Sequence, residues 1–184
     1  VHVPDVDAAR TIAGMTPEAE ALAAAFWPGA LTLVLPLRSD AGIASLVTAG
    51  LDTVAIRVPA HPVAQALLRL TGPLAAPSAN ASGRISPTCA AHVLDPDGGL
   101  AGEIAAVLDG GACPVGVEST IVGWREGEPL LLRPGGVPAE AIEAVLPDED
   151  PQAYVQRVTG LKLDAAVARL ARRGLGNVWP NPAV

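Results

Sequence analysis

The sequence predicts an α/β (α+β) fold in which a twisted, mixed β-sheet is flanked by helices. Three observations predict it: short apolar runs alternate with helical stretches, prolines and glycines separate them, and two late runs are close enough to form a hairpin. Half of the 184 residues are hydrophobic but only 3% are aromatic, so Ala, Val, Leu and Ile must build the core. This length suits one domain, or one domain and a tail.

The first predicted elements are a helix over residues 17–26 and a strand over residues 31–35. Pro17 and Glu18 suit a first helical turn, where a missing N–H is tolerated and an acid interacts favourably with the helix dipole. A Pro-Gly pair then ends the helix and leads into the strand.

The second predicted strand, residues 53–58, alternates between apolar and other residues. Its valines and isoleucine share one face, whereas Thr53 and Arg57 lie on the other, because successive side chains of a strand point to opposite faces. A helix is expected to follow over residues 61–70.

A Gly-Pro turn leads to a third predicted strand at residues 74–76, followed by the run Pro-Ser-Ala-Asn. Continued as extended chain, this run would project Ser78 and Asn80 side by side, a hydroxyl beside an amide that both donates and accepts. Small neighbours leave space above them, and ligands of open α/β sheets tend to bind at strand ends. The sequence therefore predicts a polar clamp at this point.

The remaining elements complete a first domain over residues 1–146. They are a helix over 86–94, a strand over 105–108, hairpin strands over 119–122 and 130–133, and a helix over 138–146. Residues 147–184 differ in composition, with an acidic linker followed by a basic helical pattern. This second part is either a solvated terminal helix or a helix that docks on the first domain or on a partner, and its role stays open.

Charge and composition exclude several classes of protein. The net charge is −7, and residues 1–150 carry seven basic against eighteen acidic residues, which disfavours direct nucleic-acid binding. The one lysine, Lys162, follows no glycine-rich loop, so a P-loop is excluded. No secretory signal or membrane span is visible, and Cys89 and Cys113 lack metal-ligand spacing. We therefore expect a cytoplasmic, reduced protein whose cysteines are small buried fillers.

Two arginines point to an anion. Arg57 lies within an otherwise apolar strand, where an unpaired guanidinium is costly, so it needs an acid of the protein or an anionic ligand. Arg133 ends a strand just before a Pro-Gly-Gly run, a position suited to a phosphate, although many strand ends carry an arginine.

Several hydroxyl and imidazole groups have both a functional and an ordinary interpretation. Ser119 could bind a ligand or simply be a polar strand residue, Ser86 could be a helix N-cap, and His2 could bind a carboxylate or lie at the surface. No Ser-His-Asp or Cys-His pattern and no metal-ligating cluster accompanies them. The set suits a site that binds and orients a polyanion, and we expect the arginines and the small polar groups to converge on one hollow.

Five motifs carry a resemblance to a known family. They are FWPGALT at residues 26–32, VAIRVP at 54–59, APSANASG at 76–83, ESTIV at 118–122 and LRPG at 132–135. In this order and approximate spacing, over residues 1 to about 146, the chain resembles the YrdC-like threonylcarbamoyl-AMP synthases.

The resemblance implies an enzyme that makes L-threonylcarbamoyl-AMP and pyrophosphate from L-threonine, bicarbonate and ATP, usually with Mg²⁺. The product would feed a downstream complex that makes the N6-threonylcarbamoyladenosine of tRNA. The implied threonine-binding residues are His2, Arg57 and Ser119. The implied ATP-binding residues are Thr53, Ser78, Asn80, Ser86 and Arg133, and Arg57, Ser78 and Asn80 are the implied catalytic residues.

One departure from the family pattern concerns the N-terminus. The family has a strand, a loop and a Lys-x-Arg motif ahead of the position of His2, and none of them is present here. We therefore expect this chain to lack the N-terminal strand and loop of the family, to bind ATP weakly and to turn over little.

Two other functions remain open. One is a carbamoyl-adenylate-forming domain of the hydrogenase-maturation type, which uses carbamoyl phosphate; no zinc-finger-like or acylphosphatase-like sequence accompanies the chain. The other is a non-catalytic module that binds double-stranded RNA, which the acidic charge of residues 1–150 disfavours.

Overall fold

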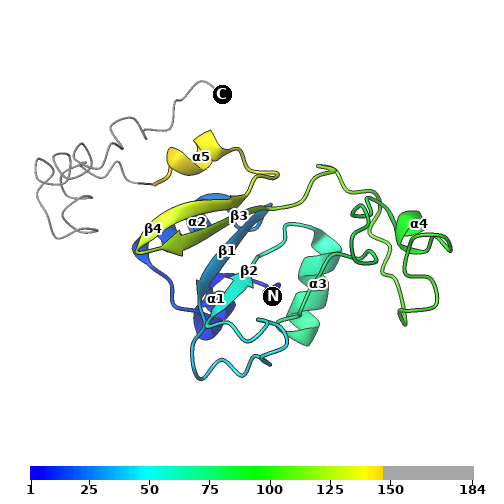
Figure 1. Cartoon of the computed structure of the whole chain (residues 1–184), viewed down its shortest axis with the longest axis horizontal. Coiled ribbons are helices and arrows are strands. Elements are labelled where there is room, and N and C mark those ends of the chain that lie inside the picture. Colours follow the sequence, from blue (N-terminus) through cyan, green and yellow to red (C-terminus); the bar gives the residue numbers. More distant parts are fainter. Residues whose placement is uncertain (147–184) are drawn as a thin grey trace, which may run out of the picture. The chain divides into compact units, whose positions relative to one another are not determined.

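The computed structural model describes residues 1–146, and the predicted linker and basic tail, 147–184, lie outside the described residues. A four-stranded sheet in the order β2-β1-β3-β4 forms its centre (Figure 1). The strands are β1 (Leu31–Pro36), β2 (Thr53–Ile56), β3 (Thr120–Arg125) and β4 (Glu128–Arg133). The central pair β1 and β3 is parallel and both outer pairs are antiparallel, so the predicted mixed sheet is confirmed.

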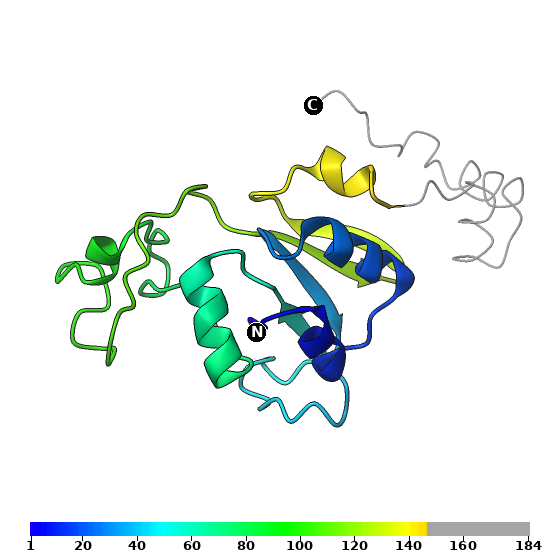
Figure 2. The same cartoon turned by 180° about the vertical axis from the view of Figure 1, so that it is seen from behind.

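Two helices cover one face of this sheet. Helices α1 (Val6–Ile12) and α2 (Pro17–Phe26) lie behind the strands in Figure 1 and in front of them in Figure 2, and α3 (Pro62–Thr71) lies beside β2. The short helix α4 (Ala90–Val93) lies in a long irregular segment beyond α3, and α5 (Ala139–Glu143) follows the hairpin. Among the helices of residues 1–146, none covers the front face of the sheet in Figure 1.

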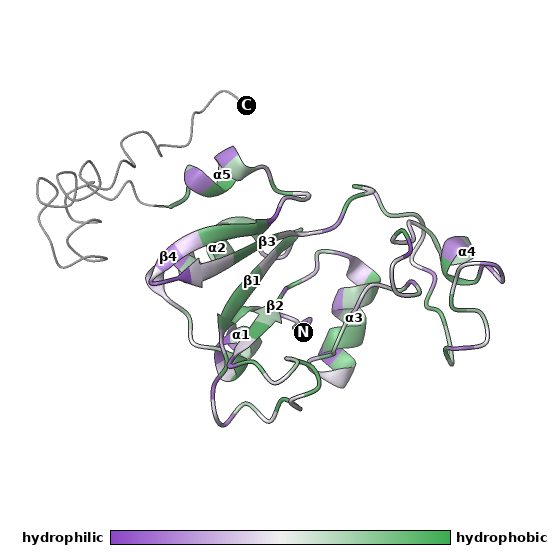
Figure 3. Ribbon diagram, in the orientation of Figure 1, coloured by the Kyte–Doolittle hydropathy of each residue, from purple (hydrophilic) through white to green (hydrophobic). Residues whose placement is uncertain are grey.

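The core lies between the sheet and the α1–α2 pair. The alternation predicted for β2 is present, because Val54, Ile56 and Val58 are each at most 2% exposed while Arg57 is only partly buried. Strand β1 has the same pattern, with its three leucines fully buried against the alanines and leucine of α2. Figure 3 shows that β1 is hydrophobic over most of its length. Period-two alternation therefore decides which polar groups reach the open face.

Several predicted elements differ from the structure. Only Leu74 makes a bridge where a strand over 74–76 was expected, residues 105–108 form no strand, and the helix over 86–94 is reduced to α4. Leu74 pairs only with His2, and propensity alone does not stabilise a short element. Helix α1, which the sequence reading missed, begins where Asp5 accepts a hydrogen bond from Ala8 N at 2.8 Å.

The hairpin is confirmed, but its turn is tighter than expected. The turn residues are Glu126 and Gly127, with φ of 55° and 87°. Positive φ at both central residues is typical of a two-residue turn that matches the twist of the flanking strands. Trp124 and Pro129, expected in the loop, are instead paired strand residues.

The N-terminal residues join two separate parts of the chain. His2 exchanges backbone hydrogen bonds of 2.8 and 3.0 Å with Leu74, and Val3 N donates to Arg57 O at 3.0 Å.

The prediction that both cysteines are buried is wrong, since Cys113 is exposed and Cys89 is only partly buried in the irregular segment. Among the residues that the structure describes, none belongs to a helix long and apolar enough to cross a membrane.

Candidate functional site

Polar side chains meet on the open face, where β1 and β3 start side by side. The parallel register aligns Leu31 with Thr120, so Thr32 and Ser119 lie on the face opposite the helices. Their hydroxyl oxygens are 2.7 Å apart. Ser119 is only 7% exposed, which makes it a fixed part of the protein rather than a mobile surface group.

Arg57 is held on the same face by the turn before β1. Its Nε donates to Gly29 O at 2.8 Å, while Gly29 N donates to Val58 O at 2.8 Å. A Cβ on Gly29 would collide with Phe26 O, so only glycine lets this turn approach so closely. Burial, and secondly the charge of Arg133, lower the pKa of Arg57.

Arg133 contacts Ser119, the residue just before β3, and the starts of β1 and β3 are called the strand entrance below. Its Nε and one terminal nitrogen donate to Ser119 O at 3.0 and 2.7 Å, and the same nitrogen reaches Ser119 Oγ at 3.2 Å. Side-chain ion pairs among residues 1–146 are made by Arg10 and Arg38, and not by Arg57 or Arg133. Two neighbouring guanidinium groups without a contacting acid are a site for an anion.

His2 adds a neutral group beside Arg57. Burial, followed by the nearby positive charge of Arg57, lowers the pKa of His2 from 6.5 to about 4. The imidazole is therefore uncharged at neutral pH, and it can hydrogen-bond to a ligand but not form an ion pair with it. The parallel bridge between the two residues brings together positions 55 residues apart in the chain.

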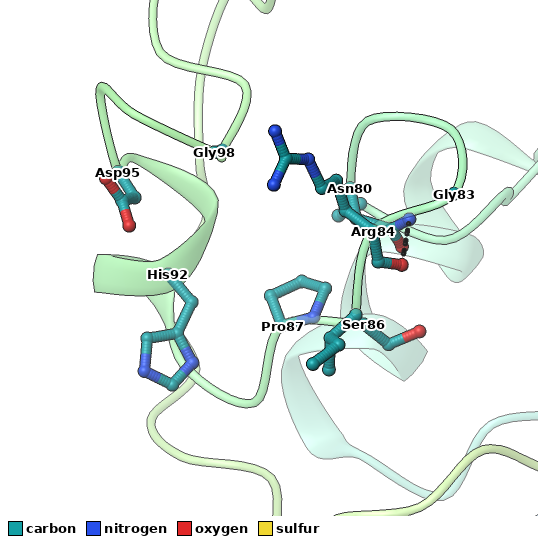
Figure 4. A pocket seen from close by; sticks show the side chains of 11 residues that line it. Asn80, Gly83, Arg84, Ser86, Pro87, His92, Asp95 and Gly98 are labelled. Carbon is teal, nitrogen blue, oxygen red and sulfur yellow. Dashed lines mark hydrogen bonds between the residues drawn. The ribbon is translucent and has the colours of Figure 1, made fainter.

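A separate cavity of about 440 Å³ lies in the irregular segment around α4. Figure 4 shows the Arg84 side chain extending between the Asn80 loop and the turn that carries Asp95 and Gly98, with His92 on the wall formed by α4. Asn80 and Ser86 line this cavity, whereas Arg57, Ser119 and Arg133 do not. The single hollow expected from the sequence is therefore two neighbouring features.

One hydrogen bond connects the cavity with the arginine pair. Ser86 Oγ donates to Glu118 Oε1 at 2.8 Å, and Glu118 directly precedes Ser119. This bond first, and the charge of Arg133 in addition, hold the pKa of Glu118 below its usual value. Ser86 is not a helix N-cap, which was the ordinary interpretation of this residue, because α4 starts after Cys89.

The polar clamp at Ser78 and Asn80 is not built on a strand. Ser78 is exposed in irregular chain, so the period-two argument for its orientation does not hold. The Asn80 amide closes its own loop, with Nδ2 donating to Ala81 O at 2.9 Å and Arg84 O at 3.1 Å. Thr53 opens β2, partly buried and opposite Pro36.

Sequence reasoning missed three residues that build the site. Thr32, Gly29 and the side chain of Glu118 were not predicted as site residues, although all three lie within the quoted motifs. The alternation that marked Arg57 could also have marked Thr32, whose neighbours Leu31 and Leu33 are fully buried. Nothing local signals the contact of Glu118, because its partner is 32 residues away.

Metal ligands are sparse in this part of the molecule. Within residues 1–146 no group of three or more His, Cys, Asp or Glu side chains could hold a metal ion. These residues therefore do not fit a resident metal ion.

Comparison with known proteins defines the class of this fold and site. The model of the Sua5/YciO/YrdC family, described as "Telomere recombination", matches residues 1–135. The chain belongs to this family, which confirms the resemblance inferred from the motifs.

The similar proteins include named synthases. The chain is 52% identical over 148 residues to the threonylcarbamoyl-AMP synthase of Bacillus subtilis, covering 79% of this chain and 42% of that protein. A crystal structure of Pyrococcus abyssi Sua5 complexed with L-threonine is similar with a TM-score of 0.73 and 37% identity, over 94% of this chain and 59% of that one. The chain thus spans less than half the length of the curated synthase.

A shorter match involves another protein. Over 46 residues, a quarter of this chain, the sequence is 67% identical to a dTTP/UTP pyrophosphatase of Albidiferax ferrireducens, of which the match covers 23%. The sequence analysis found no resemblance of this kind.

Proposed function

We propose that the chain is the substrate-binding domain of a threonylcarbamoyl-AMP synthase, which converts L-threonine, bicarbonate and ATP into L-threonylcarbamoyl-AMP, pyrophosphate and water. The observation that carries the proposal is the neighbouring pair Arg57 and Arg133: Arg57 binds Gly29 just before β1, Arg133 binds Ser119 just before β3, and neither forms an ion pair with an acid among residues 1–146. Two substrates of this reaction are anions at one end, a carboxylate and a triphosphate. The similarity to named synthases supports the same assignment.

Threonine is assigned to the side of Arg57. A guanidinium with one N–H on Gly29 retains further donors for a carboxylate. Neutral His2 and the fixed hydroxyl of Ser119 supply hydrogen bonds to the remaining polar groups of the amino acid. The role of Arg57 as a catalytic residue is to orient threonine so that its amine faces the nucleotide.

The nucleotide is assigned to Arg133 and to the cavity side. Arg133 would offset charge on the phosphates, while Asn80 and Ser86, with Thr53 and Ser78, contact the rest of ATP. Magnesium would enter as MgATP, held mainly by the phosphates, since residues 1–146 contain no cluster of three or more His, Cys, Asp or Glu side chains that could hold it. As catalytic residues, Ser78 and Asn80 would orient the α-phosphate of ATP, which is attacked in the reaction.

The reaction then needs no nucleophile from the protein. The amine of threonine forms a bond to the carbon of bicarbonate, and water leaves, giving a carbamate. A carbamate oxygen attacks the α-phosphorus, the bond to the β-phosphate breaks, and pyrophosphate departs with the electron pair. The threonylcarbamoyl-AMP would be consumed by a tRNA-modifying complex in the cytoplasm. Residues 147–184 are proposed as a linker and tail separate from this domain.

Threonine binding tests the proposal without requiring turnover. Isothermal titration of the chain with L-threonine, with L-serine and L-valine for comparison, should give binding that requires both the carboxylate and the hydroxyl. Pyrophosphate release should then depend on threonine and bicarbonate together. A chain that binds no threonine, or that releases pyrophosphate equally without it, contradicts the proposed function.

A further inference from the structure

Glu118 stands between the two halves of the proposed site without a role of its own. Its carboxylate accepts the Ser86 hydroxyl proton at 2.8 Å, and its backbone oxygen accepts from Gly136 N at 2.9 Å. A Cβ on Gly135 would lie 2.5 Å from the same oxygen. The backbone of residue 118 is therefore fixed by the loop after β4, while its side chain is exposed and free to serve another purpose.

The contact decides what Ser86 can bind. A serine hydroxyl has one proton to donate and two lone pairs. Because the proton points to Glu118, the hydroxyl can only accept from a ligand in the cavity. Its ligand must carry a donor, such as a ribose hydroxyl or a purine amino group. A phosphate oxygen, which only accepts, would have to compete with Glu118 for this proton.

The charge of Glu118 acts in the opposite direction at the arginines. Its carboxylate interacts with Arg133, which in turn raises the positive potential around Arg57. Glu118 directly precedes Ser119, whose backbone oxygen accepts from Arg133 at 2.7 Å, and an acid this near to a guanidinium weakens its attraction for a second anion. The same side chain thus favours a neutral donor group at Ser86 and disfavours a phosphate near Arg133.

We propose that Glu118 is a positioning residue of the nucleotide site, which fixes the Ser86 hydroxyl as an acceptor for the nucleoside half of ATP and moderates the binding of the phosphate half. This inference rests on the proposed function, and it divides the ligand between the cavity and the arginine pair.

The two halves of the ligand test the inference separately. Adenosine and inorganic pyrophosphate are titrated into the wild-type chain and into the variants Glu118→Ala and Glu118→Gln. Loss of a hydrogen bond to a charged group should weaken adenosine binding about three- to tenfold in Glu118→Ala, and less in Glu118→Gln, which keeps an oxygen acceptor. Pyrophosphate should bind equally well or more tightly in both variants.

If Glu118 had only a structural role, its replacement would weaken the binding of adenosine and of pyrophosphate together. The charge-matched control Glu103→Gln changes an exposed acid of the same segment and should alter neither titration. Ser86→Ala should reproduce the adenosine loss, and the double variant Glu118→Ala with Ser86→Ala should lose no more than either single variant.

The outcomes separate this inference from the proposed function. Three results would overturn the role of Glu118 alone. They are weaker binding of both adenosine and pyrophosphate in the Glu118 variants, additive losses of affinity in the double variant, and normal adenosine binding by Glu118→Ala. A wild-type chain that binds neither adenosine nor pyrophosphate would overturn the proposed function, and this inference with it.

Discussion

Replacing Arg57 with methionine separates the ligand-binding role of its guanidinium from its contribution to folding. Methionine keeps most of the length of the side chain but removes the charge and all donors. In the structure, the Arg57 guanidinium gives one hydrogen bond, to Gly29 O at 2.8 Å, and its burial and the charge of Arg133 both disfavour the charged form. The site therefore holds a cation that the fold itself does not need.

The expected effect of Arg57→Met on protein stability is much smaller than its expected effect on threonine binding. Loss of the Gly29 bond costs about 1 kcal/mol of unfolding free energy. Removal of a partly buried charge that faces Arg133 offsets part of this cost, so the net change should stay below about 1 kcal/mol. For a carboxylate ligand, loss of a charge-assisted pair costs about 3 kcal/mol, or roughly a hundredfold in affinity.

Denaturant unfolding and threonine titration measure these two quantities on the same samples. Arg38→Met is the matched control, because Arg38 forms an exposed ion pair with Asp40 and should leave threonine binding unchanged. An Arg57→Met chain that binds threonine with wild-type affinity refutes the assignment. A chain that unfolds several kcal/mol more easily instead identifies Arg57 as a structural residue.

Three further predictions concern the strand entrance and its surroundings. Thr120→Val should lower the unfolding free energy by about 2–3 kcal/mol, because the fully buried Thr120 hydroxyl both donates to Val137 O and accepts from Val137 N. Thr120→Ser, which keeps the hydroxyl, should recover most of this loss when both variants are unfolded with denaturant. Gly135→Ala should destabilise by about 1–3 kcal/mol, since its Cβ would lie 2.5 Å from backbone atoms at the start of β3, whereas Gly98→Ala, with open space around it, should melt normally. The folded state keeps His2 neutral down to about pH 4, while the unfolded chain takes up the proton near pH 6.5, so stability should fall as the pH falls between these values. In His2→Asn this fall should be smaller by about 1–2 kcal/mol, and an unchanged pH profile would contradict the lowered pKa.

The candidate site shows where sequence reasoning succeeds. The alternation in residues 53–58 is enough to place Arg57 on the face opposite the core, since neighbouring side chains of a strand must point in opposite directions. The sequence left open whether Arg57 pairs with an acid of the protein or with an anionic ligand, and within residues 1–146 it forms no side-chain ion pair. For Ser78 the same reasoning is wrong, because its run has no partner strand to keep it extended.

Local patterns in the sequence were sufficient for the helix of residues 17–26, the strands of 31–35 and 53–58, and the hairpin, because periodicity and turn chemistry act between near neighbours. The motifs were sufficient for the family. Only the tertiary structure decided that Thr32 meets Ser119, that Arg133 reaches the same strand entrance, and that Ser86 donates its proton to Glu118. Those contacts join residues 14 to 87 positions apart, and they depend on strand register and loop path, which no local pattern encodes.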